Sequence, residues 1–218
     1  MPEFRSRPDG SKYPITPKKG GIAAAAVVLT GVVAFGAGGL GGAGAGGTAT
    51  DSAAGQSLRT ENGKREARKG QTTQAWARIG WKQLQHKAEH ALDCAVNSYG
   101  QVREFFLRNP CKSLERDLLA VADDKGNTVV VSIAWVRMGS ADAAERLKDL
   151  ADTDGTGSIA PLGSAALHLG DVRLTGLYYS SDRRGSLTVI SEAAAGSGRP
   201  DGDAMDAATE VAVLFPPP

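Results

Sequence analysis

The stretch Thr128-Val-Val-Val-Ser-Ile-Ala-Trp-Val-Arg-Met138 decides the fold class, because it is rich in β-branched and aromatic residues and is the best strand candidate in the chain. The residues before it, Asp123-Asp-Lys-Gly-Asn127, form a strong turn signal, and a second apolar run precedes that turn. Two strands joined by a tight turn run antiparallel. This part of the sequence therefore predicts an antiparallel hairpin.

The residues that follow this hairpin predict a helix and then a second hairpin. Ser140 is placed to cap a helix over residues 141–151, with Ala144 and Leu147 facing the core. After a loop at 152–164 that contains Asp, Gly, Thr and Pro, the runs 172–179 and 186–191 predict two strands around a turn at 181–185. A final helix is expected from Asp203 to Phe215, where three prolines stop it.

Upstream of the first hairpin, apolar residues recur at spacings of four and three, which is typical of one face of a helix. The residues with this spacing are Ala77, Trp81, Leu84, Ala88, Ala91 and Ala95. They predict a single helix from about Gln74 to Asn97, with Gly100 as its C-terminal cap. The predicted fold class is therefore α+β, in the order α-ββα-ββα, with a four-stranded antiparallel sheet and helices on one face.

A long uncharged segment lies near the N-terminus. No charged residue occurs from Gly20 to Thr50, and Ile22 to Leu40 would span about 28 Å as a helix, close to the thickness of a bilayer core. We expect a transmembrane segment at residues 21–45. A cleaved signal peptide is an alternative, since Lys18-Lys19 and Ala43-Gly-Ala45 flank the apolar run, and a Gly/Ala-rich linker is another.

Basic residues before the uncharged segment predict its orientation, because positive flanks stay in the cytoplasm. They are Arg5, Arg7, Lys12, Lys18 and Lys19. The chain is thus expected to be a single-pass protein of the cell membrane with a cytoplasmic tail at 1–20 and an extracytoplasmic domain at 73–215. Residues 46–72, which are polar and small with no apolar period, are expected to form a flexible linker.

The chain contains two cysteines, Cys94 and Cys111. In a domain expected to lie outside the cytoplasm they predict a disulfide. Two buried free thiols in a cytosolic protein are the alternative.

The motif His86-Lys-Ala-Glu89-His90 spells H-x-x-E-H, a pattern that certain zinc proteases carry on a helix. On the predicted helix, His86, Glu89 and His90 share one face, which makes them candidate ligands of a metal-dependent hydrolase. That face lies opposite Leu84 and Ala88, so we interpret it as a solvated helix surface. No catalytic residue, cofactor or metal site is assigned.

A second motif, Asp152-Thr-Asp154-Gly-Thr156, matches the D-x-D-G-T sequence of haloacid-dehalogenase-type phosphatases. In those enzymes it follows a hydrophobic strand, whereas here it follows a predicted helix. We interpret it as an ordinary Asp/Gly loop.

The formal net charge of +1 argues against a nucleic-acid-binding protein, which carries a clear basic excess. The stretch from Tyr99 to Leu114, together with Val129 to Met138 and Gly155-Thr-Gly157, resembles membrane-anchored proteins of high-GC Gram-positive (actinobacterial) bacteria, for which no activity is established. The expected function is a non-enzymatic, membrane-tethered module that binds a protein or envelope ligand. The alternatives are the metal-dependent hydrolase and a sensor or accessory subunit of another membrane protein, which would pair its membrane helices through Gly38 and Gly42.

Overall fold

The computed structural model describes residues 3–6, 12–15, 53–163, 167 and 172–218. The chain divides into two compact units, residues 1–52 and 53–218. In the first unit, β1 (Glu3–Ser6) pairs antiparallel with β2 (Lys12–Ile15). The predicted transmembrane segment at 21–45 lies outside the described residues. None of the helices that the structure describes is both long enough and apolar enough to cross a membrane.

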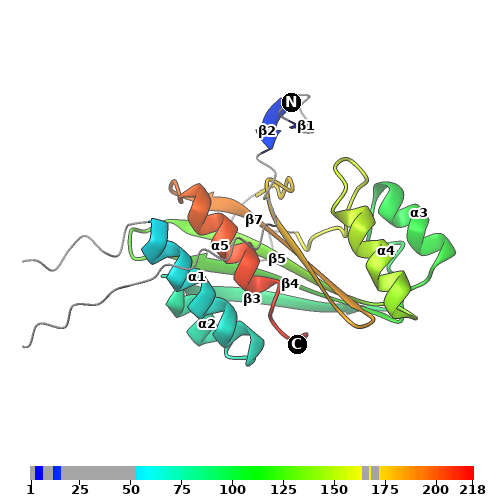
Figure 1. The fold of residues 1–218 in the computed structure, drawn as a ribbon, viewed down its shortest axis with the longest axis horizontal. Coiled ribbons are helices and arrows are strands. Elements are labelled where there is room, and N and C mark those ends of the chain that lie inside the picture. The colour runs from blue at the N-terminus through cyan, green and yellow to red at the C-terminus, as the bar shows by residue number, and fades with distance from the viewer. Residues whose placement is uncertain (1–2, 7–11, 16–52, 164–166, 168–171) are drawn as a thin grey trace, which may run out of the picture. The chain divides into compact units, whose positions relative to one another are not determined.

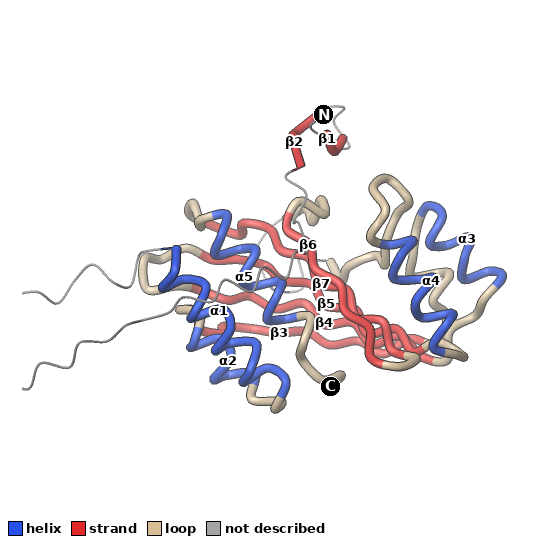
Figure 2. The backbone as a smooth tube through the Cα atoms, in the orientation of Figure 1, coloured by secondary structure: helices blue, strands red, loops and turns tan. Residues whose placement is uncertain are grey.

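The second unit contains five helices and five strands among its described residues (Figure 1). In chain order they are α1 (Ala53–Arg68), α2 (Thr72–Arg78), β3 (Lys82–Ala91), α3 (Gly100–Arg108), β4 (Ser113–Ala122), β5 (Thr128–Arg137), α4 (Ala141–Ala151), β6 (Tyr178–Arg184), β7 (Leu187–Ser197) and α5 (Gly202–Ala212). The strands form one antiparallel sheet in the order β3-β4-β5-β7-β6 (Figure 2). The α+β class and the two antiparallel hairpins are confirmed, but the sheet has five strands and not four.

The additional strand comes from the segment predicted as one long helix, and that prediction is wrong. The helical part, α2, stops at Arg78, and β3 begins four residues later at Lys82. Gly80 lies between them with a φ of 82°, a left-handed conformation that suits glycine and ends a helix. Gly100, predicted to cap that helix, is instead the first residue of α3.

Helices and a long loop cover both faces of the sheet, so the prediction of helices on one face is also wrong. Residues of β4 and β5 alternate between two faces, as the pleat requires. The face that carries Leu119, Ile133 and Trp135 packs against α1, α2 and α5, and we call it the α5 face. The other, the α4 face, packs against α3 and α4 through Leu114 and Val136, and it also packs against five apolar residues between α4 and β6: Ile159, Leu162, Leu167, Val172 and Leu174. A sheet buried on both sides explains why β5 is almost continuously apolar.

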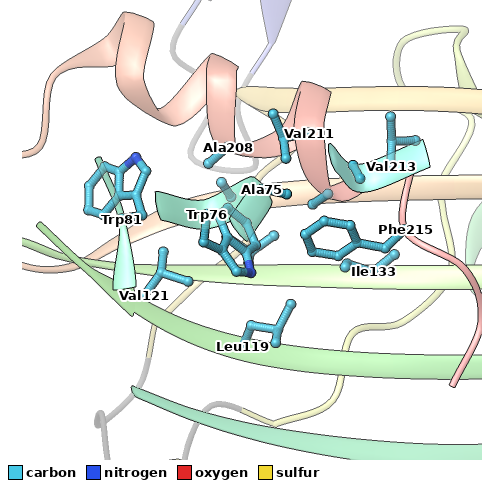
Figure 3. Close-up of a cluster of buried hydrophobic side chains, with 14 of the residues drawn as sticks. Ala75, Trp76, Trp81, Leu119, Val121, Ile133, Ala208, Val211, Val213 and Phe215 are labelled. Atoms are coloured by element: carbon cyan, nitrogen blue, oxygen red, sulfur yellow. The ribbon is translucent and has the colours of Figure 1, made fainter. Parts of the chain in front are cut away.

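The core under the α5 face is built around aromatic residues, several of which Figure 3 shows together. The rings of Trp76 and Phe215 meet edge to face, with centroids 5.3 Å apart. The indole N–H of Trp135 donates to the carbonyl of Phe215 at 2.9 Å, which fixes the segment after α5 to the sheet. Trp81 is 4% exposed. All three tryptophans are therefore buried in this core.

Helix α1 lies within the segment predicted as a linker, so the folded unit begins at Ala53 and not at residue 73. Its buried surface is formed by two small residues one turn apart, Gly63 and Ala67. A Cβ at Gly63 would lie 2.8 Å from a methyl of Ile79 and 3.0 Å from a methyl of Val211. The helix therefore approaches α2 and α5 through the absence of a side chain, which an apolar periodicity cannot reveal.

The second hairpin is displaced from its predicted position. Strand β6 begins at Tyr178, and the turn lies at Gly185–Ser186 between β6 and β7. Val172 and Leu174 were predicted to begin the strand. They pack instead against a buried cluster on the α4 face, formed by Leu118, Ala120, Val130, Leu162 and Leu167. The predicted cap of α4 is confirmed, because the Ser140 hydroxyl accepts from the N–H of Ala143 at 3.1 Å.

Candidate interaction surface along strand β3

Strand β3 is one of the two edges of the sheet, so one side of its backbone pairs with β4 and the other pairs with no strand that the structure describes. Every side chain from Leu84 to His90 is exposed. This strand carries the residues His86, Glu89 and His90, and it leads directly into the segment of Cys94. The geometry of β3 therefore decides what each candidate site residue does.

On the α5 face, two histidines of β3 stand beside two carboxylates of β4. His86 Nδ1 lies 3.7 Å from Asp117 Oδ1, and His90 Nδ1 lies 3.4 Å from Glu115 Oε1. Both imidazoles are 57% exposed, whereas the Asp117 and Glu115 side chains are 14% and 22% exposed. Each histidine thus screens a carboxylate that is mostly withdrawn from water.

Asp117 is the most unusual of these groups. The 3.7 Å distance to His86 exceeds that of a hydrogen bond, and the buried Asp117 Oδ1 has no hydrogen-bond partner within the described chain. Burial raises the pKa of the Asp117 carboxyl above its usual value, opposed by the nearby His86 and by the N–H of Leu118. The carboxylate therefore costs folding free energy when it is ionised.

On the opposite face, Glu89 forms an ion pair with Arg116, whose side chain is 7% exposed. Arg116 also donates from Nη1 to the carbonyl of Ala160 at 2.9 Å, which ties the strand pair to the loop after α4. Because successive side chains of a strand alternate, Glu89 lies on the face opposite His86 and His90. The predicted grouping of these three residues on one helix face is wrong, and with it the geometry of the H-x-x-E-H zinc site. The described residues contain no cluster of three or more His, Cys, Asp or Glu placed to hold a metal ion.

The predicted disulfide is present between Cys94 and Cys111, whose Cα atoms are 6.1 Å apart. It joins the segment that follows β3 to the segment that precedes β4. Cys94 is buried against Val102 and Phe106 of α3, so the bond fixes this small helix to the end of the sheet.

Exposed apolar side chains concentrate in this part of the described chain. Seven large hydrophobic residues are exposed, and five of them fall between residues 84 and 107. The five are Leu84, Leu92, Val96, Tyr99 and Leu107. Of these, Leu92 and Val96 are each 75% exposed and Leu107 is 68% exposed. Leu92 and Val96 flank Cys94 in the segment after β3, and Leu107 lies on α3, the helix against which Cys94 packs; we call these three residues the disulfide surface.

The D-x-D-G-T motif follows a helix, as predicted, and its first carboxylate has structural partners. Asp152 accepts hydrogen bonds from the hydroxyls of Tyr179 at 2.9 Å and Ser181 at 2.6 Å, and from Lys148 at 2.5 Å. Burial, together with the Asp152 carboxylate, raises the pKa of the Tyr179 phenol, which therefore stays protonated and donates. These bonds attach the end of α4 to β6, and Thr156 closes the loop by donating to the carbonyl of Leu150 at 2.6 Å.

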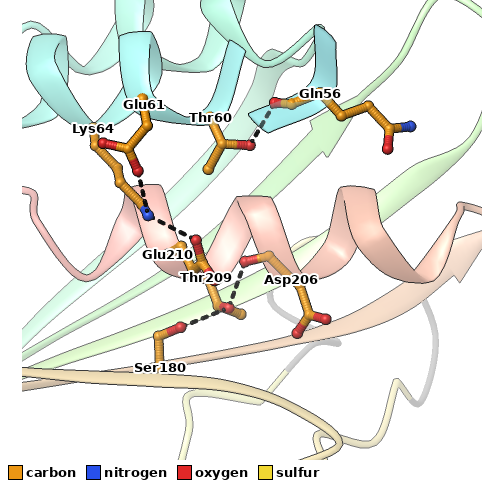
Figure 4. A network of polar contacts seen from close by, with 8 residues as sticks. All are labelled: Gln56, Thr60, Glu61, Lys64, Ser180, Asp206, Thr209 and Glu210. Carbon is orange, nitrogen blue, oxygen red and sulfur yellow. Dashed lines mark hydrogen bonds and ion pairs between the residues drawn. The ribbon is translucent and has the colours of Figure 1, made fainter. Parts of the chain in front are cut away.

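A polar layer joins α1, α5 and β6 on the α5 face (Figure 4). Lys64 contacts Glu61 at 2.9 Å and Glu210 at 2.8 Å, and the Ser180 and Thr209 hydroxyls are 3.0 Å apart. Burial lowers the pKa of the Lys64 ammonium, but the hydrogen bonds to Glu210 and Glu61 outweigh it and leave the pKa raised. An open recess of about 220 Å³ lies beside this layer, between Arg68, Asp182 and Leu214. Sequence reasoning missed it because it placed Lys64 and Arg68 in a linker.

No protein-family model, curated protein or solved structure matches the chain. The case for a function therefore rests on this chain's own residues. Gly38 and Gly42, through which membrane helices were expected to pair, lie outside the described residues.

Proposed function

We propose that the chain is a single-pass membrane protein whose disulfide-closed domain lies outside the cytoplasm and binds a protein partner of the cell envelope, without catalysis. The observation that carries the proposal is the concentration of exposed apolar side chains next to the disulfide. Large apolar side chains that gather on one surface mark interaction sites, whereas single ones scattered over a surface need no explanation. The rigid attachment of α3 by the disulfide favours binding, because less conformational entropy is lost.

The remaining chemistry of the domain supports a binding role. Asp152, Glu89 and Arg116 are engaged in contacts that join one element of the fold to another. The hydrolase alternative depended on His86, Glu89 and His90 sharing one face, and the strand separates them. We therefore place the function on the disulfide surface.

Photocrosslinking in intact cells tests this function. A photoreactive amino acid is introduced into the full chain at Val96 or at Leu107, and separately at Leu58 as a matched control. Leu58 is 67% exposed and Leu107 68% exposed, so the two positions differ in place and not in accessibility. We expect one protein adduct of the same mass from positions 96 and 107, absent from position 58.

A charge at the disulfide surface gives the second arm of the test. Leu107→Lys should abolish the adduct formed from position 96, because burial of an unpaired charge opposes docking. Leu58→Lys should leave that adduct unchanged. Adducts of equal yield from positions 58 and 107, or none from positions 96 and 107, would rule out the disulfide surface as the binding site.

The location is tested separately by labelling the thiols of intact cells with a membrane-impermeant maleimide. Reaction of Cys94 and Cys111 only after reduction is expected for an extracytoplasmic disulfide. Reaction without reductant, and only after lysis, would place the domain in the cytoplasm and overturn the proposal.

A further inference from the structure

The two edges of the sheet differ in how much of the fold surrounds them. The side chains of β6 are half-buried from Tyr178 to Arg183, and residues of α1 and α5 lie beside it. On β3 only Gln83 and Ala91 are partly covered. An exposed edge strand presents a row of unpaired backbone N–H and C=O groups, which is a template for another strand.

We propose that β3 pairs antiparallel with β3 of a second copy of this chain, about a two-fold axis at Ala88, so that the two sheets become continuous. A two-fold axis between antiparallel strands places one residue opposite its own copy and preserves the faces of the sheet. The choice of Ala88 follows from the strand itself. Its register with β4 shifts between Gln83 and Gln85, so the regular stretch runs from Gln85 to Ala91, and Ala88 is its centre.

Charge complementarity selects the same register. With Ala88 on the axis, Lys87 of each copy lies opposite Glu89 of the other, on the same face of the sheet. Axes at Lys87 or at Glu89 would oppose like charges, and an axis at His86 would pair Lys87 and Glu89 with glutamines. Opposite charges across a strand pair stabilise it, whereas like charges oppose it. Glu89 would then lie between Arg116 of its own chain and Lys87 of the second copy.

The positions of two exposed leucines also favour this register. Leu84 and Leu92 are 51% and 75% exposed and flank the regular stretch, so pairing about Ala88 brings Leu84 of one copy near Leu92 of the other at each end of that stretch. A strand of mixed charge also discriminates between partners, because a strand without the matching pattern leaves Lys87 without a counter-charge. The same charges that discourage unspecific pairing therefore favour pairing with a second copy.

Cysteine crosslinking of the full chain in its membrane tests the pairing. Residues directly opposite one another in an antiparallel pair have Cα atoms about 4.5–5.5 Å apart, which is within reach of a disulfide. Ala88→Cys should give a covalent dimer under mild oxidation at least tenfold faster than Lys82→Cys or Lys125→Cys, two exposed positions outside the regular stretch. Equal rates at the three positions, or faster crosslinking of Lys87→Cys than of Ala88→Cys, would overturn the proposal.

A charge exchange tests the register without relying on a new cysteine. Lys87→Glu should raise the dissociation constant of the dimer in detergent about tenfold or more, measured by sedimentation. Glu89→Lys should do the same, and the double exchange Lys87→Glu/Glu89→Lys should restore most of the affinity. Because Glu89 also binds Arg116, the melting temperature of each variant is measured beside it. A monomeric wild type, or a double exchange no tighter than the single variants, would contradict the pairing.

This inference goes beyond the proposed binding function and is separable from it. The Leu107→Lys variant should lose the partner adduct and keep the Ala88→Cys crosslink. If the crosslink fails while the adduct forms, only the self-pairing is wrong, and the reverse result would dismiss only the partner surface.

Discussion

The two edge strands of the sheet have opposite relations to the rest of the molecule. Strand β6 is attached to helices on both faces: Arg184 donates to the carbonyls of Val213 and Phe215 at 2.8 Å and 3.2 Å, and Tyr179 donates to Asp152. Strand β3 is attached through its ladder with β4, a few side-chain contacts with the same strand, and the disulfide that follows it.

Two edge strands of one sheet can therefore differ in how their side chains are used. The β6 edge contributes to the stability of the fold, since its side chains satisfy carbonyls at the end of α5 that the helix itself leaves unpaired. The β3 edge contributes little beyond its backbone bonds and leaves its side chains for other contacts. Perturbations of the two edges should therefore have different consequences.

The largest effect is expected on the β3 side. Replacing both cysteines, in Cys94→Ser/Cys111→Ser, should lower the free energy of unfolding by about 3 kcal/mol, because the bond closes a loop of 17 residues in the unfolded chain. Urea denaturation of the full chain measures this difference. Hydrogen exchange should increase more in α3 and at the end of β3 than in β6, because the disulfide also fixes α3 locally. An equal increase in β6 would show that the two edges are not independent.

A smaller loss is expected on the β6 side. Arg184→Met should cost about 2 kcal/mol, since removal of a charged donor leaves partly buried carbonyls of residues 213–215 unsatisfied. The neighbouring Arg183 donates only to Gly185 within the same turn, so Arg183→Met is the matched control and should change stability by less than about 0.5 kcal/mol. Equal melting temperatures for the two variants would mean that Arg184 does not anchor the edge.

The helix beside β6 offers a third test. Glycine to alanine in a helix normally stabilises it, but Gly63→Ala should cost about 1 to 2 kcal/mol, because the new methyl meets Ile79, Val211 and the carbonyl of Ala75. The exposed Arg65→Ala in the same helix is the control and should be close to neutral. Thermal unfolding distinguishes them, and a stabilised Gly63→Ala would contradict the close approach of α1.

The smallest effect concerns Asp117, which lies on β4 next to β3. We expect Asp117→Asn to stabilise the protein by about 1 kcal/mol or less at pH 7. The pKa of Asp117 is raised on folding, so the folded state binds this proton more tightly than the unfolded state does. The wild type therefore loses stability as the pH rises through the unfolded and then the folded pKa, and the variant does not. The gain should vanish at low pH; a gain that is constant with pH would exclude titration of Asp117 as its cause.

Local signals in the sequence were sufficient for part of the fold. Thr128–Arg137 is a strand because β-branched residues dominate it, and Asp123 closes the preceding turn by accepting from the N–H of Asn127 at 2.8 Å. Ser140 caps α4 as its position predicts. The residues that determine each of these elements lie within the element or directly beside it, which explains why reasoning from the sequence identified them.

The same reasoning failed where a distant segment supplies the deciding contact. Residues 82–91 contain good helix formers at helical spacing, yet they form β3 because β4 offers a complete ladder of backbone hydrogen bonds. The candidate site changed with them, since a strand separates Glu89 from His86 and His90. The signal available in advance was Gly80, which interrupts the periodic run with a left-handed conformation.

By itself, the sequence determined the α+β class, the two hairpins, the helix after Ser140 and the pairing of the only two cysteines, because turn residues, caps and strand propensity act locally. Only the folded chain shows that α1 packs through Gly63, that both faces of the sheet are covered, and that His86 lies beside Asp117 on one face while Glu89 binds Arg116 on the other. The physical reason is that an edge strand and a polar helix gain their stability from segments far along the chain, and no window of local sequence contains those contacts.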